Sequence, residues 1–81
     1  MIEEQVREVI SVLEMIREDG SVPKNVKGKI GLTITSLSSD NETSIKVDKA
    51  LQELGDMSND PNIPIYTRVE ILNIISMLST D

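Results

Sequence analysis

The sequence matches itself when it is shifted by 41 positions, and this internal repeat limits the possible folds more than any other feature. The shift aligns two proline loops, residues 19–23 and 60–64, each of which precedes an apolar segment that ends its unit. A period of this length is typical of one supersecondary unit that buries its apolar face against a copy of itself. The chain is therefore expected to contain the same unit twice. Identical pairs are Val6 with Val47, Leu13 with Leu54, Pro23 with Pro64, Ile30 with Ile71, Ile34 with Ile75 and Leu37 with Leu78.

The segment 24–38 fits two kinds of secondary structure. Apolar and small polar residues alternate from Ile30 to Ile34, which is the period of a half-buried strand, and its β-branched residues and glycines also favour a strand. Its counterpart in the second copy, from Val69 to Leu78, lacks glycine and has helical spacing. By this analogy we predict a helix in both copies. The helical stripe of the first copy would comprise Val26, Ile30, Ile34 and Leu37.

Two further segments are amphipathic with helical spacing. Apolar residues recur at steps of three and four from Ile2 to Ile16 and again from Ile45 to Met57, with charged residues between them. Short connections between helices favour antiparallel neighbours. We therefore predict an all-α fold, a four-helix antiparallel bundle built from two repeated helical hairpins. The single domain would span residues 1–81, with helices near 2–19, 23–38, 42–57 and 64–79.

Helix ends have recognisable signals in this sequence. Gly20 is expected to close the first helix in a left-handed conformation, and Pro23 has its backbone angle set for the first turn of the next. Ser39 and Glu42 have the spacing of a capping box for the third helix, although Asn41 or Thr43 is an alternative cap.

Composition excludes several kinds of chemistry. Histidine and cysteine are absent, which excludes disulfides, thiolate nucleophiles, imidazole acid–base catalysis and zinc sites built on those side chains. A net charge of -6 disfavours a general phosphate-backbone binder. The sequence has no apolar run of membrane-spanning length and no signal peptide pattern, so we expect a cytoplasmic protein with no membrane association.

The acidic residues that are candidate metal ligands have a simpler interpretation. Glu14 and Glu18 lie one helical turn apart, but a di-metal bundle normally adds a Glu-x-x-His partner that this chain lacks, so a solvated face is favoured. Asp56, Asn59 and Asp60 lack the spacing of a calcium loop, so helix caps and turns explain them better. No catalytic residue, metal ligand or cofactor site is predicted.

Basic and glycine residues concentrate near the second helix. Gly28 and Gly31 share one helical face, where close packing of a neighbouring helix is favoured over a groove for a partner. The one basic concentration lacks interleaved aromatic residues, so a solvated face is favoured and nucleic-acid binding is disfavoured. It comprises Lys24, Lys27, Lys29 and Arg68.

The last helix is apolar over more than one narrow stripe, which is typical of a central helix or of one that a partner covers. One of its faces is predicted to carry Leu72, Ile75 and Met77 or Leu78. Tyr66, the single aromatic residue, is either an interface anchor or a plug at the bundle end, and the plug with its hydroxyl in water is favoured. The predicted interface residues are Tyr66, Ile71, Ile74, Met77, Gly28 and Gly31.

Two strings carry a family resemblance. Residues 60–68, Asp-Pro-Asn-Ile-Pro-Ile-Tyr-Thr-Arg, and residues 22–26, Val-Pro-Lys-Asn-Val, resemble the hallmark loops of a small archaeal group, uncharacterised protein family 0147. The resemblance covers essentially the full length. It implies a small acidic four-helix bundle and no assigned activity.

Three functional hypotheses follow. The first is a non-enzymatic protein–protein interaction module that forms a homodimer through its excess apolar surface, since so short a chain buries a limited core by itself. The second is a nucleic-acid-associated protein that uses the lysine cluster. The third is a small enzyme that combines carboxylates with Lys, Ser or Tyr, for which the sequence has no specific signal.

Overall fold

The computed structural model describes residues 2–79, so residues 1, 80 and 81 of the predicted domain lie outside the described residues. It contains four helices, α1 (Ile2–Arg17), α2 (Lys24–Leu37), α3 (Thr43–Ser58) and α4 (Ile65–Leu78). Each helix begins and ends within two residues of its predicted bounds. Residues 2–79 contain no strand, which confirms the all-α prediction and the helix in the ambiguous second segment.

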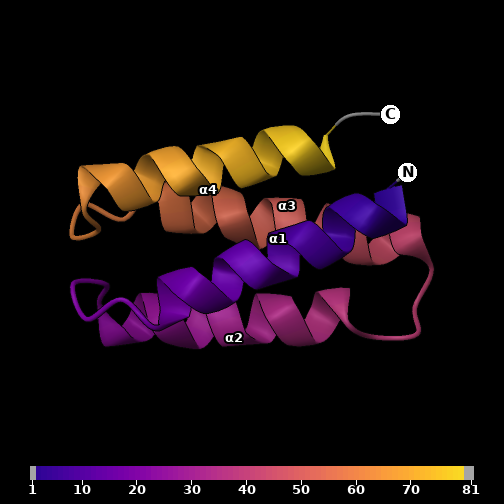
Figure 1. The fold of residues 1–81 in the computed structure, drawn as a ribbon, viewed down its shortest axis with the longest axis horizontal. Coiled ribbons are helices and arrows are strands. Elements are labelled where there is room, and N and C mark those ends of the chain that lie inside the picture. Colours follow the sequence, from indigo (N-terminus) through magenta and orange to yellow (C-terminus); the bar gives the residue numbers. More distant parts are fainter. Residues whose placement is uncertain (1, 80–81) are drawn as a thin grey trace.

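The helices run antiparallel in chain order and close into a ring, because α1 packs on α2, α2 on α3, α3 on α4, and α4 on α1. Figure 1 shows both proline loops at one end of the bundle, whereas the connection from α2 to α3 lies at the other end. The molecule measures 32 × 20 × 18 Å. Within the described residues no helix combines the length and the apolar character needed to cross a bilayer.

The core repeats with the period that the sequence predicts. Every buried residue of the first hairpin has a counterpart 41 positions later that is buried too, which confirms the register of the repeat. All but two of these side chains are apolar, and the hydroxyl of buried Thr33 donates to the Lys29 carbonyl oxygen at 2.9 Å. The pairs are Val6/Val47, Val9/Ala50, Leu13/Leu54, Ile16/Met57, Val22/Ile63, Val26/Thr67, Ile30/Ile71, Thr33/Ile74 and Leu37/Leu78.

The loop after α1 differs from its prediction. Among residues 2–79 no glycine has a positive φ, so Gly20 does not close the helix in a left-handed conformation. Instead the Ser21 backbone N–H donates to Asp19 Oδ1 at 2.8 Å, and the Val22 N–H donates to the Asp19 carbonyl at 3.2 Å. This side-chain turn reverses the chain without a special glycine conformation. It also directs Val22 into the core.

The predicted capping box at the start of α3 is wrong. Ser39 donates its hydroxyl to the Ser36 carbonyl at 2.8 Å, so the side chain belongs to the end of α2. Glu42 is the N-cap residue of α3 and makes no side-chain cap hydrogen bond. Pro23 and Pro64 each precede their helix in an extended conformation, and their carbonyl oxygens accept from Lys27 and Arg68.

Candidate interaction surface

The outward face of α4 is apolar, although it points away from the core. The helix buries Thr67, Ile71, Ile74 and Leu78 on one side. At about 100° per residue, Ile65, Val69 and Leu72 lie on the opposite side. Their side chains are 77%, 51% and 50% exposed. We refer to these three residues as the α4 strip.

Two predicted interface residues are wrong, because Ile71 and Ile74 are fully buried inside the bundle. Met77 is half-buried and packs against the core. Leu72, which the sequence groups on one face with Ile75 and Met77 or Leu78, is exposed. Periodicity does not decide between these faces, because apolar residues surround the helix and any of several stripes would satisfy it.

The same ambiguity occurs in the second helix to a smaller extent. Thr33 is buried where the sequence favoured Ile34, which is half-buried at the edge of the core. A signal for the α4 strip was nevertheless present in the sequence, since residues 65, 69 and 72 have the helical spacing of a second stripe.

Gly28 and Gly31 do not mark a close approach between helices. A Cβ atom added at Gly28 would meet no atom within 4 Å, and one at Gly31 would meet only the Arg17 guanidinium at 3.6 Å. The prediction of close helix packing is therefore wrong. Both glycines lie on the outer side of α2, where a side chain would fit.

Tyr66 joins the two hairpins at the loop end of the bundle. Its ring is 53% exposed, and its hydroxyl donates to Asp19 Oδ2 at 2.8 Å rather than pointing into water. The backbone N–H of Ser21 and this hydroxyl both stabilise the Asp19 carboxylate and hold its pKa below the ordinary value of 3.8. The same hydrogen bond raises the pKa of Tyr66 above 10.0. The residues that plug the bundle end are Val22 and Ile63, which are buried.

A second, equivalent hydrogen bond connects the hairpins in the reverse direction. Asn25, the counterpart of Tyr66 in the first repeat, donates its side-chain amide to Asp60 Oδ2 at 3.5 Å. Asp60 also accepts from the Asn62 backbone N–H at 2.8 Å, which confirms that this acid forms a loop turn. Each repeat thus supplies one aspartate acceptor and one donor from the first turn of the following helix. We refer to these two hydrogen bonds as the crossed pair.

Arg68 stabilises the same end of the bundle. Its Nε donates to the Ser58 carbonyl at 2.9 Å, and its Nη2 donates to the Asp60 carbonyl at 2.8 Å. The guanidinium thus satisfies backbone acceptors at and beyond the end of α3. These two hydrogen bonds hold the Arg68 side chain against the backbone, so it is not part of a free cationic surface.

The lysines near α2 do not form one surface. At about 100° per residue, Lys24 and Lys27 share one face of the helix, whereas Lys29 points to a different side. A nucleic-acid interface needs several cations on one face. The arrangement therefore gives no observation in favour of the nucleic-acid hypothesis.

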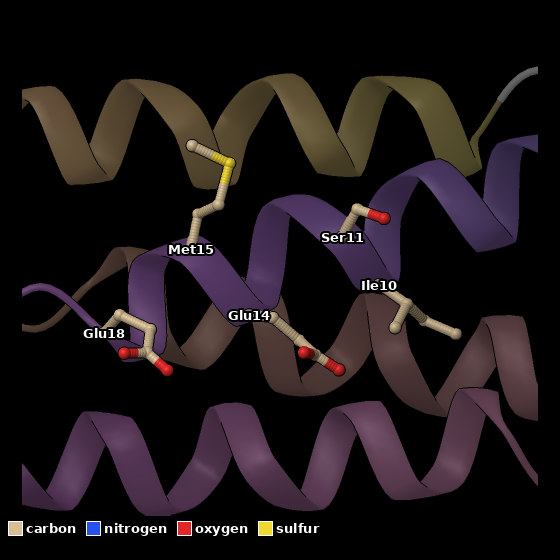
Figure 2. Close-up of a pocket in the computed structure, with 5 residues that line it drawn as sticks. All are labelled: Ile10, Ser11, Glu14, Met15 and Glu18. Carbon is tan, nitrogen blue, oxygen red and sulfur yellow. The ribbon is translucent and has the colours of Figure 1, made fainter.

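The acidic residues of α1 line only a shallow surface depression. Figure 2 shows Met15 reaching from α1 toward α4, while Glu14 and Ile10 extend toward α2. Glu14 and Glu18 are both exposed, as a solvated face requires. Within the described part of the chain, no group of three or more acidic side chains is arranged to hold a metal ion.

Comparison with known proteins identifies the family. The uncharacterised protein family UPF0147 matches residues 1–80 of the chain. The chain belongs to UPF0147. The sequence resemblance to uncharacterised protein family 0147 is therefore confirmed.

Archaeal members of UPF0147 are similar over nearly the whole chain. A member from Methanosarcina mazei is 36% identical over 78 residues, covering 95% of this chain and 84% of the relative. One from Thermoplasma volcanium is 38% identical over 72 residues, covering 88% and 81%. A crystal structure of a protein of unknown function superposes with a TM-score of 0.87 at 36% identity, covering 95% of this chain and 89% of that one. The four-helix fold is thus shared with a solved structure, and the function of UPF0147 is unknown.

Proposed function

We propose that this UPF0147 protein is a non-enzymatic protein–protein interaction module whose contact surface is the α4 strip. The observation that carries the proposal is the exposure of Ile65, Val69 and Leu72 on the face opposite the core. Isolated apolar residues are normal on a protein surface, whereas three on one helical face form a continuous apolar patch. Such a face is typical of a helix that a protein partner covers.

The pKa shifts of the polar residues support the proposal less directly. The described pKa shifts concern Asp19 and Tyr66, and hydrogen bonds of the crossed pair and the adjacent loop account for both. An enzyme site normally places a perturbed ionisable group in a concave pocket. Asp19 and Tyr66 instead lie at a bundle end with structural partners, so neither favours a catalytic role.

A photo-crosslinking experiment tests this function. A photoreactive amino acid replaces Leu72 in the full chain, and in a control variant it replaces Ile45, which has a similar exposure of 56% but lies on α3. After irradiation in an archaeal host, we expect a discrete protein adduct from position 72 and none from position 45. Equal labelling at both positions, or none at either, would contradict the proposal.

A further inference from the structure

The net charge of each helix limits how two copies of this chain can approach one another. The protein as a whole carries a charge of -6, and a two-fold contact that pairs a helix with its own copy adds like-charge repulsion wherever that helix is charged. Helix α1 contains four acidic and two basic residues, α2 contains three lysines and no acid, and α3 contains three acidic and two basic residues. Only α4 is neutral, with Arg68 and Glu70 as its charged residues.

The spacing of the α4 strip fits a second helix. Ile65, Val69 and Leu72 follow one another at steps of four and three, which are the steps of the contact positions in a two-helix coiled coil. In that pattern Val69 takes the a position and Leu72 the d position. The next position with this spacing is Ser76, four residues after Leu72. Because Ser76 is polar, the apolar strip ends at Leu72.

From these two observations we infer that the partner of the α4 strip is the α4 strip of a second copy, in a two-fold symmetric homodimer. This inference rests on the proposed function and names its partner. A two-fold contact requires a self-complementary patch, and three aliphatic side chains without a charge among them satisfy that requirement. Val69 lies at the centre of the strip, so a two-fold axis there sets Val69 of one protomer against Val69 of the other.

The size of the strip sets the strength of the dimer. The strip consists of three partly exposed side chains, and its area is much less than the roughly 800 Å² that each partner buries in a standard interface. The dimer is therefore expected to be weak. It forms at high concentration and dissociates on dilution.

Sedimentation velocity of the full chain from about 1 µM to about 1 mM tests the dimer. We expect the mass to rise from 9.0 kDa to twice that value and to stop there. The Leu72→Glu variant places two like charges in the contact and is expected to weaken association by about thirtyfold or more. The Ile45→Glu variant adds the same charge on α3 and is expected to associate like the wild type.

A disulfide test gives an independent measurement, because the natural sequence contains no cysteine. Under mild oxidation, Val69→Cys is expected to form a covalent dimer through the two-fold axis, while Ile45→Cys is expected to remain mainly monomeric. Circular dichroism of every variant checks that the helices are retained.

The results separate this inference from the proposed function. A monomer at all concentrations, or equal effects of Leu72→Glu and Ile45→Glu, overturns the homodimer. If position 72 then still crosslinks to a different protein, the interaction function stands and only the identity of the partner is wrong. If position 72 crosslinks to nothing and the chain stays monomeric, both the proposed interaction function and the homodimer are wrong.

Discussion

Adjacent residues of α4 provide the sharpest test of which face of this helix belongs to the core. Ile71 is fully buried and Leu72 is half exposed, although both are aliphatic residues of similar size. Replacing Ile71 by alanine removes three buried carbon groups, or about 2.4 kcal/mol of transfer free energy. The cavity raises the expected loss of unfolding free energy to about 3–4 kcal/mol. The same change at Leu72 removes carbons that are half in water and is expected to cost about 1 kcal/mol or less.

The difference is large on the scale of this domain. An 81-residue protein is expected to have an unfolding free energy of roughly 4–12 kcal/mol, so Ile71→Ala removes a large fraction of it. Its melting temperature should fall by about 15–25 °C, compared with a few degrees for Leu72→Ala. Ile71→Val, which retains most of the side chain, should cost about 0.5–1.5 kcal/mol.

The assay is urea unfolding followed by circular dichroism at low micromolar concentration, so that association contributes little to the measured free energy. A loss at Leu72 that equals or exceeds the loss at Ile71 would refute the assignment of the two faces. It would mean that the face carrying Leu72, and not the face carrying Ile71, is the buried one in solution.

Two other predictions concern the loop end and the glycines. Tyr66 is the single aromatic residue, so its ultraviolet titration is free of overlap, and we expect a pKa above 10.0 that falls toward the ordinary value in Asp19→Ala; an unchanged pKa would show that the hydrogen bond is absent. Folding raises the Tyr66 pKa, so the contribution of this group to the unfolding free energy is present below pH 10 and is lost as the pH rises through the folded pKa. Folding lowers the Asp19 pKa, so the contribution of Asp19 is present above pH 3.8 and is lost as the pH falls through the folded pKa. Gly28→Ala and Gly31→Ala should each raise the unfolding free energy by about 0.5–1 kcal/mol, since both sites are helical with room for a methyl group. A lower melting temperature for both variants would point instead to a close contact at this face.

The repeat made much of the fold predictable. Matching the two halves resolved the ambiguous segment 24–38 as a helix, although its glycines and β-branched residues favoured a strand. It also fixed which positions share a role, since all nine buried pairs obey the shift of 41. The predictions of helix ends from short motifs were less reliable. Gly20 does not close α1, and Ser39 and Glu42 do not form a capping box, because other hydrogen bonds that the motifs do not specify form at these positions.

The candidate site was predicted only in part. The sequence indicated that α4 has more apolar surface than one core stripe needs, and Tyr66 was correctly placed on the surface at the bundle end. Ile71 and Ile74 were assigned to the interface, whereas they form the core. The crossed pair was not predicted, because its hydrogen bonds join residues 35 and 47 positions apart in the chain.

The sequence by itself determined the number of helices, their approximate ends and the register of the two hairpins, and it shows that histidine and cysteine side chains are absent. These properties depend on local spacing, on composition and on the match between the two halves. The tertiary structure decided which side of α4 faces inward, because a helix with apolar residues around most of its circumference has no intrinsic preference and its neighbours α1 and α3 select the buried side. That selection leaves Ile65, Val69 and Leu72 on the surface, and the proposed function follows from it.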